Sequence, residues 1–263
     1  MQETGCVIVR NFFDEKDVAA MASYVDYSFN VQGEGVLNRY LLKECDLEPV
    51  LKETSQNIKE KRKLNPTYSN SVKNGAKLAR FIGHSESMLT VRTPNIAEKL
   101  LELFEQKGLK ALLKNYFGSD PCVSVKKWNL RKSSPPPAPI DFHQDGAFMG
   151  DEIASLNCWI PLSDCGASCD VHGIDIVPIR LKKLFAGRSG VLDWTVAANA
   201  IVDEYSENAI VTPTFRKGDL IFFDHLVLHR TQFLPNPAQN RYAIETWFFD
   251  SVNFPKNQIP LKW

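Results

Sequence analysis

The sequence lacks a charge imbalance, because 31 Lys and Arg residues are matched by 31 Asp and Glu residues. No net field draws the chain to nucleic acid or to an anionic membrane. It also lacks any run near the roughly 20 apolar residues that would cross a bilayer. Its first residues show no basic segment followed by an apolar signal region. We therefore expect a soluble, cytoplasmic protein whose partner is a small-molecule substrate, with its oligomeric state left open.

The six cysteines also lack the close-set pairs of the common zinc motifs. Scattered through 263 residues, they indicate reduced thiols rather than a disulfide framework. One cluster could be drawn as a zinc site, but its spacing does not favour that interpretation. The cluster consists of Cys158, Cys165, Cys169 and His172.

The pattern of apolar residues predicts a mainly β protein with flanking helices. A short strand at 6–9 precedes a helix for which Asp14 is a plausible N-cap, and a second helix is expected over 96–106. From about residue 123 onward, short β-rich runs alternate with Gly, Pro, Asn and Asp clusters, which favours a double-sheet jelly roll.

We expect a single domain over residues 1–263. In it, N-terminal helices, at about 14–115, buttress a β-rich core at about 120–250. Three long irregular segments, 61–77, 133–139 and 186–207, are predicted to be binding loops or lids, or else disordered.

His143, Gln144 and Asp145 form an H-x-D tripeptide, and His229 follows far downstream in another strand-like run. Side chains two apart on a strand leave the same face, so His143 and Asp145 can reach one metal while Gln144 points away. Two imidazoles and a carboxylate on one side of a metal are typical of non-haem Fe(II) oxygenases. The alternative is a surface pair with an unrelated, hydrogen-bonded core histidine.

Arg241 lies in a strongly apolar run twelve residues past His229. A cation in such a strand is costly unless an anion pairs with it. Its planar guanidinium suits a carboxylate such as the distal one of 2-oxoglutarate. A buried salt bridge to Glu245 or Asp250 is the alternative.

The chain resembles the phytanoyl-CoA dioxygenase-like branch of the Fe(II)/2-oxoglutarate-dependent oxygenases. The likeness lies in GCVIVRNFFDEKDVAAM, FHQDGAF, NCWIPLSD, KGDLIFFDHLVLHRT and NRYAIE, in that order. It implies a double-stranded β-helix, the jelly-roll or cupin-like core, with iron held by His143, Asp145 and His229. The cofactors implied are Fe(II), 2-oxoglutarate as cosubstrate, and O2.

The resemblance also implies roles for residues around the iron. Arg241 would pair with the distal carboxylate of 2-oxoglutarate, with the Thr231 hydroxyl assisting. Trp159 would lie beside the cosubstrate, although a core aromatic is an equal alternative. Lys126 and Trp128 share one face of a strand that faces the pocket in the family, Lys126 toward the cosubstrate and Trp128 toward the substrate.

Substrate contacts are expected from apolar residues in or beside loops, namely Phe148, Met149 and Trp194, unless these only pack the loops. His172 is expected to be an exposed loop residue, with substrate binding as the alternative. His225 mimics a helical H-x-x-x-H pair with His229, but its surroundings predict a turn.

The implied activity is that of a dioxygenase that hydroxylates a small organic molecule, in secondary metabolism, while 2-oxoglutarate is decarboxylated to succinate. Related halogenases carry a small residue in place of the carboxylate, so Asp145 favours hydroxylation. Many relatives carry a Pro-Gly-Ser-His-like turn where this chain has Pro178, Ile179 and Arg180, which alters the substrate-side wall.

Three alternatives stay open. One is a metal-binding jelly-roll protein without turnover, and another is desaturation, epimerisation or cyclisation by the same iron chemistry. The third is a zinc hydrolase, for which no general base is obviously placed.

Overall fold

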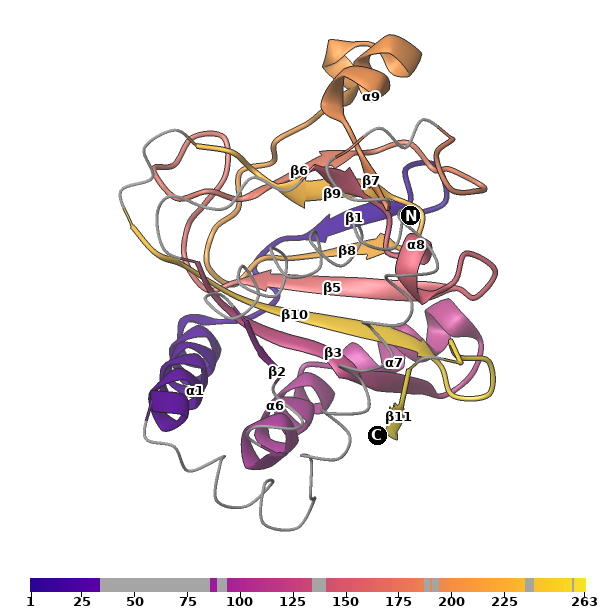
Figure 1. Ribbon diagram of the computed structural model, residues 1–263. Coiled ribbons are helices and arrows are strands. Elements are labelled where there is room, and N and C mark those ends of the chain that lie inside the picture. Colours follow the sequence, from indigo (N-terminus) through magenta and orange to yellow (C-terminus); the bar gives the residue numbers. More distant parts are fainter. Residues whose placement is uncertain are drawn as a thin grey trace, which may run out of the picture.

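The computed structural model describes residues 1–33, 86–88, 94–133, 141–186, 190, 194–234, 239–256 and 258–263. In these ranges the chain forms two antiparallel sheets, with helices beside one of them (Figure 1). The prediction of a mainly β, jelly-roll fold is confirmed. The expected loop at 61–77 and nearly all of the proline-rich segment 133–139 lie outside the described residues.

The larger sheet has seven strands, and its middle is the long strand β10. Neighbouring strands in it are antiparallel. In spatial order the strands are β1 (Cys6–Val9), β8 (Leu220–Asp224), β5 (Ser155–Pro161), β10 (Arg241–Asp250), β3 (Pro121–Ser133) and β11 (Pro260–Lys262), and β2 (Glu86–Met88) also pairs with β3.

The smaller sheet has four short strands, and its two middle strands each carry one histidine of interest. In order they are β6 (Ile174–Val177), β9 (Leu228–Thr231), β4 (Phe142–His143) and β7 (Thr195–Val196). His143 on β4 lies directly opposite His229 on β9. Residues 86 apart in the chain therefore become neighbours through one antiparallel pairing.

Three helices, α1 (Glu15–Gly33), α6 (Pro94–Gln106) and α7 (Leu109–Phe117), pack on the outer face of the larger sheet (Figure 1). The backbone amide of Asp17 donates to Asp14 Oδ1 and that of Asp14 donates to Asp17 Oδ2, both at 2.9 Å. These reciprocal bonds form a capping box at the start of α1, which agrees with the predicted N-cap at Asp14. Of the helices described, none is both long and apolar enough to span a bilayer.

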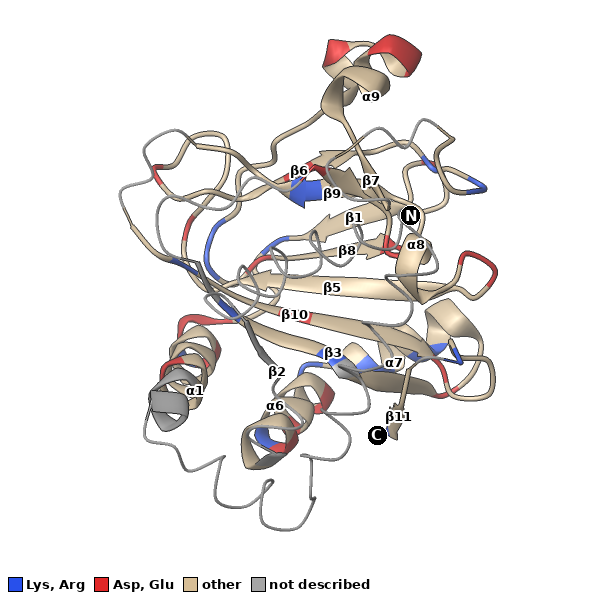
Figure 2. Cartoon of the chain, in the orientation of Figure 1, with Lys and Arg blue, Asp and Glu red and all other residues tan. Residues whose placement is uncertain are grey.

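The larger sheet is covered on both faces, which explains why all seven residues of β5 are buried. Leu156, Cys158 and Ile160 pack on the helices, whereas Trp159 belongs to a second cluster with residues of the smaller sheet. We call the face toward the smaller sheet the inner face. Figure 2 shows that β5 and most of β10 carry no charge, so a charged side chain there needs a specific partner.

Trp128 corrects one expectation. Instead of lining a pocket, it is fully buried in the helix-side core, with its ring 6.2 Å from that of Phe104. Its neighbours in sequence, Lys127 and Asn129, lie on the inner face instead. Lys127 Nζ lies over the Trp247 ring, and Asn129 is directly opposite Glu245 in the pairing of β3 with β10. The prediction chose the wrong face for Trp128 because both faces of β3 are buried and hydrophobicity cannot tell them apart.

The segment 186–207 is less irregular than expected. It contains β7 and the helix α9 (Ala198–Tyr205), whose Ile201 is buried against the outer side of the smaller sheet. Two further short helices were not predicted, α8 (Gly146–Met149) and the 3-10 helix η1 (Glu207–Ala209). The five cysteines in the described ranges are free thiols.

Replacing Trp128 with alanine should lower the free energy of unfolding by about 3–5 kcal/mol, because the substitution leaves a large cavity between the sheet and α6. Urea denaturation of the apoprotein measures this. Phe233→Ala is the control, since this side chain is 55% exposed, and it should change stability by less than about 0.5 kcal/mol. A loss below about 1 kcal/mol in Trp128→Ala would contradict the core placement.

Candidate metal centre

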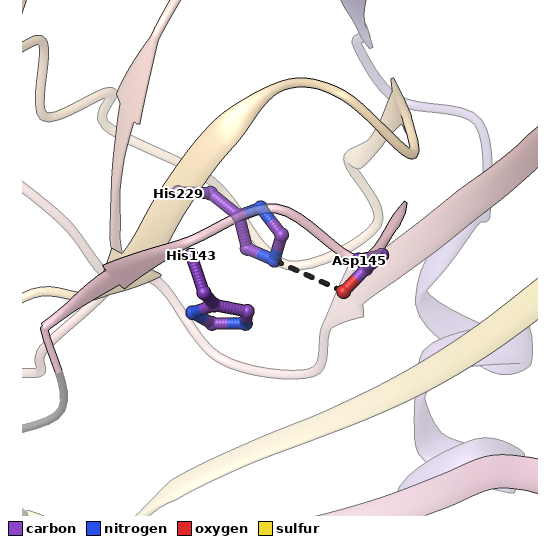
Figure 3. Close-up of side chains that lie close together, drawn as sticks. All are labelled: His143, Asp145 and His229. Carbon is purple, nitrogen blue, oxygen red and sulfur yellow. Dashed lines mark ion pairs between the residues drawn. The ribbon is translucent and has the colours of Figure 1, made fainter. Parts of the chain in front are cut away.

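His143, Asp145 and His229 meet between the two sheets (Figure 3). The two histidines come from paired strands, β4 and β9. Asp145 does not lie on a strand, contrary to our expectation: its φ of −60° and ψ of −31° are helical, and it immediately precedes α8 without a capping hydrogen bond from its side chain. The strand ends at His143, so the turn into α8, rather than strand parity, directs the carboxylate toward the histidines.

The potential ligand atoms of the three side chains all lie within 4.8 Å of one another. His229 Nε2 is 3.7 Å from Asp145 Oδ1, and the His143 and His229 rings are 4.3 Å apart. Asp145 and His229 are buried, and His143 is half-buried. In the described part of the chain no other group of His, Cys, Asp or Glu side chains converges in this way, so Cys158, Cys165, Cys169 and His172 form no such cluster.

The hydrogen bonding of His229 indicates whether the three side chains fit a metal ion. Its Nδ1 is 3.0 Å from the carbonyl oxygen of Val227. A carbonyl only accepts, so Nδ1 carries a proton, and in the neutral ring, the form that binds a metal, Nε2 directs a lone pair toward Asp145 Oδ1. Neither Nε2 nor Oδ1 has a hydrogen-bond partner among the described residues. In that form two buried acceptors face one another, which is unfavourable alone and favourable around a cation, so the three side chains fit a metal.

The protonation states agree with that fit. Burial, with a smaller contribution from His229, holds the pKa of His143 well below its usual range, so its imidazole is neutral. A neutral imidazole is the form that binds a metal. Burial raises the pKa of Asp145. A divalent cation beside Asp145 would offset that effect by stabilising the carboxylate.

Two side chains of the larger sheet fix the other oxygen of Asp145. Trp247 Nε1 on β10 donates to Asp145 Oδ2 at 2.6 Å, and Asn157 Nδ2 on β5 donates to it at 3.2 Å. Asn157 Nδ2 also donates to Glu245 Oε1 at 3.2 Å. With Oδ2 occupied by these donors, Oδ1 is oriented toward His229. The sequence analysis did not identify either donor, although an asparagine inside a mostly apolar strand is a signal that could have found one.

Glu245 is a second buried carboxylate on the inner face. Burial alone would raise the pKa of Glu245, but the charge and hydrogen bond of Arg131, together with smaller contributions that include the Asn157 hydrogen bond, outweigh burial, and the pKa is lowered. Glu245 is therefore ionised and paired with Arg131. Arg131, Glu245, Asn157 and Asp145 thus form one chain of polar contacts across three strands.

Arg241 lies at the start of β10 on the inner face and is 2% exposed. Its Nη1 donates to the carbonyl of Gly173 at 2.9 Å, and its guanidinium lies 5.6 Å from the centre of the Trp159 ring. Burial, and then the nearby Arg131, lower the pKa of Arg241 to about 10, so it remains a cation at neutral pH. Trp159 itself packs edge-on against Phe215, at 5.1 Å.

Thr231 ends β9, two residues beyond His229, and pairs with Ile174 of β6. Because alternate residues share a face, Thr231 lies on the same side of the smaller sheet as His229. Lys126 lies in β3, but its side chain is outside those described. Lys127, which sequence reasoning passed over, reaches the site instead: its Nζ is 4.4 Å from the centre of the Phe148 ring.

An aromatic wall flanks His143 on the side of α8. The Trp194 ring is 5.4 Å from the His143 ring, and the Phe148 ring is 5.6 Å from that of Trp194, both edge-on. Met149 is buried on α8. The structure thus brings Phe148 and Trp194 next to the trio.

The other two histidines differ from each other. His225 lies in the predicted turn, with Nε2 3.0 Å from the carbonyl oxygen of Asp151. His172 is fully buried, so the expectation of an exposed loop residue is wrong. The segment before β6 has no periodic pattern from which its burial could be inferred.

Gln144, between the two ligand candidates, points away from them as expected. Its Nε2 donates to the carbonyl of Leu226 at 2.6 Å, and its Oε1 accepts from the amide of Phe185 at 2.7 Å. It therefore ties the segment after β6 to the turn before β9.

The family model described as phytanoyl-CoA dioxygenase matches residues 1–233. That range includes His143, Asp145 and His229 and stops before Arg241. The comparison with curated proteins gives no match.

Among solved structures, the chain is similar to the non-haem α-ketoglutarate-dependent carbocyclase SnoK from nogalamycin biosynthesis. The identity is 12% and the TM-score 0.56, over 95% of this chain and 81% of that one. The epimerase SnoN, in complex with Fe3+, α-ketoglutarate and nogalamycin RO, is 15% identical with a TM-score of 0.46, over 70% of this chain and 76% of that one. The likeness to SnoK shows a shared fold.

Fe(II) added anaerobically at 100-fold excess over its Kd should stabilise the protein by about 2.7 kcal/mol, because it binds the folded state alone. That corresponds to a rise in Tm of about 5 °C or more, reversed by a chelator. Asp145→Ala should abolish the rise. Asp219→Asn is the control, since this buried aspartate pairs with Arg10 and should keep it. A full metal-induced rise in Asp145→Ala would contradict the site.

Trp247→Phe should weaken metal binding about 10-fold, because it removes the donor that orients Asp145. Titration calorimetry with Fe(II) under nitrogen measures the Kd. Trp128→Phe is the matched control: it makes the same change on the opposite face of the sheet. Equal Kd values in the two variants would show that the Trp247 hydrogen bond does not support the metal.

Proposed function

This chain belongs to the phytanoyl-CoA dioxygenase family and is an Fe(II)/2-oxoglutarate-dependent oxygenase, and from that premise we propose that it hydroxylates a small organic molecule. The observation that carries the proposal is the buried convergence of His143, Asp145 and His229, with the cation of Arg241 on the same inner side.

His143, Asp145 and His229 are the proposed ligands of Fe(II). Two neutral imidazoles and one carboxylate leave the site one net positive charge, so a dianionic cosubstrate can bind without accumulating negative charge. When bound, iron and 2-oxoglutarate supply the oxidation of a C–H bond by O2, with 2-oxoglutarate converted to succinate and carbon dioxide. The protein's own task is to position that bond and exclude water.

Arg241 is the proposed partner of the distal carboxylate of 2-oxoglutarate. Its burial removes competing water, which strengthens an ion pair. The Gly173 carbonyl and the Trp159 ring hold the guanidinium in place, so little ordering is needed when the carboxylate arrives. Thr231, on the same side as His229, is the proposed neutral donor to this carboxylate.

The proposed substrate side is the aromatic wall of Phe148 and Trp194 next to His143. Such a wall suits the apolar body of a small molecule, and Lys127 at its edge suits a polar or anionic substituent. No side chain in this wall is required as an acid or base. Hydroxylation is favoured because Asp145 fills the position that related halogenases leave open for halide.

Anaerobic addition of Fe(II) and then 2-oxoglutarate tests the function. We expect a visible charge-transfer band that is absent in His143→Ala. Admission of O2 should then give succinate, coupled to a product 16 mass units heavier than substrate, found by mass spectrometry of a small-molecule panel. Tight binding of both partners without oxygen-dependent succinate would contradict oxygenase turnover and leave a binding protein.

Arg241→Lys should raise the Kd for 2-oxoglutarate about 10-fold, because a point ammonium cannot form the two-pronged pair with a carboxylate. Titration of the charge-transfer band gives this Kd. Lys217→Ala, at a half-exposed surface pair with Glu15, should leave it unchanged. An unaltered Kd in Arg241→Lys would remove Arg241 from its proposed role.

A further inference from the structure

His172 is a buried imidazole to which the proposed function gives no task. It is fully buried, two residues before β6. Neither of its ring nitrogens has a hydrogen-bond partner among the described residues. Burying a polar group without a partner is unfavourable, so such a group in a native fold calls for an explanation. An apolar residue of similar size would fill the same space without that cost.

The position of His172 directs it toward the cosubstrate region. Ile174 and Ile176 of β6 lie in the inner cluster with Trp159, and Ile174 pairs with Thr231 of β9. His172 is two residues before Ile174, so an extended chain puts it on the same inner side. The chain remains paired with β9's continuation there, because the amide of Gln232 donates to the carbonyl of Gly173 at 3.1 Å.

Arg241 lies next to His172. Its guanidinium donates to the carbonyl of Gly173, the residue that follows His172. The two side chains are close enough to interact electrostatically, since burial and then Arg241 lower the pKa of His172 to about 3. His172 is therefore neutral at physiological pH and offers one N–H donor and one acceptor. A neutral donor beside a cation is suited to an anion that the cation also binds.

We propose that His172 is a second, neutral hydrogen-bond donor to the distal carboxylate of the cosubstrate, beside Arg241. The proposal rests on the proposed function, which supplies 2-oxoglutarate as the ligand. It explains why the fold retains an unsatisfied imidazole: the partner arrives with the cosubstrate. It also makes His172 a determinant of specificity, because a 2-oxo acid with an apolar end leaves its donor unsatisfied.

Binding of two cosubstrates to the Fe(II)-loaded, full-length protein tests the proposal. Calorimetry under nitrogen compares 2-oxoglutarate with 2-oxopentanoate, which carries a methyl group in place of the distal carboxylate. His172→Phe should raise the Kd for 2-oxoglutarate about 10-fold, as expected for loss of one hydrogen bond to a charged group. Its Kd for 2-oxopentanoate should change by less than about threefold. His172→Gln, which retains a donor, should recover part of the affinity.

The unfolding midpoint distinguishes this role from a purely structural one, because the loss of a structural contact would lower the midpoint. Urea denaturation of metal-free His172→Phe should show a midpoint equal to or above that of the wild type, since the change removes an unsatisfied polar group. His225→Phe is the matched control: it removes the contact with the Asp151 carbonyl, so its midpoint should fall while its preference for 2-oxoglutarate stays unchanged.

The outcomes separate this inference from the proposed function. If the wild type binds neither Fe(II) nor 2-oxoglutarate, the proposed function is wrong. If the wild type prefers 2-oxoglutarate and Arg241→Ala loses that preference while His172→Phe keeps it, only the role of His172 is wrong. A lower unfolding midpoint in His172→Phe, with unchanged 2-oxoglutarate binding, would identify His172 as a packing residue.

Discussion

Asp145 is held by a hydrogen bond from a tryptophan of the opposite sheet, and the site depends on that contact. Trp247 occupies one carboxylate oxygen at 2.6 Å, which leaves the other directed at His229. Because Asp145 sits at the start of a four-residue helix, its local backbone cannot fix the side chain by itself. The larger sheet supplies the rigidity, and the smaller sheet supplies the histidines.

The larger sheet can act as this support because its outer face is a closed apolar core. Helices α1, α6 and α7 cover that face, and the inner face is free to carry Arg131, Asn157, Glu245 and Arg241. Charges in such a place are stable only in pairs or networks. Arg131 and Glu245 neutralise each other, whereas the proposed role of Arg241 assigns its charge to a ligand.

Much of this organisation could be predicted from the sequence. The strand-like context of His143 and His229 predicted that they converge, and an arginine in an apolar run marked Arg241 for attention. The prediction for Trp128 failed because a strand buried on both faces carries no hydrophobic alternation. Asp145 was expected on a strand because a two-residue strand gives no sign of where it ends.

The features that could not be predicted from the sequence depend on long-range contacts. The partners of Asn157 and Trp247 depend on which strands become neighbours, and sequence order does not state this: β5 lies between β8 and β10. The burial of His172 likewise results from a pairing with the residues after β9. Nothing local to residues 165–173 distinguishes a buried loop from an exposed one.

Gln144 has a consequence for how such a protein can diversify. It binds the amide of Phe185 and the carbonyl of Leu226, and both are backbone groups that every residue except proline at 185 can offer. The two hydrogen bonds that anchor this segment to the middle of the H-x-D tripeptide therefore do not depend on its side chains, whereas Ile179, Leu181 and Phe185 also pack on the core of the smaller sheet. An insertion or deletion between Pro178 and Phe185 would instead pull on both neighbouring residues, His143 and Asp145. The anchoring of the segment after β6 thus tolerates a change of side chain better than a change of length.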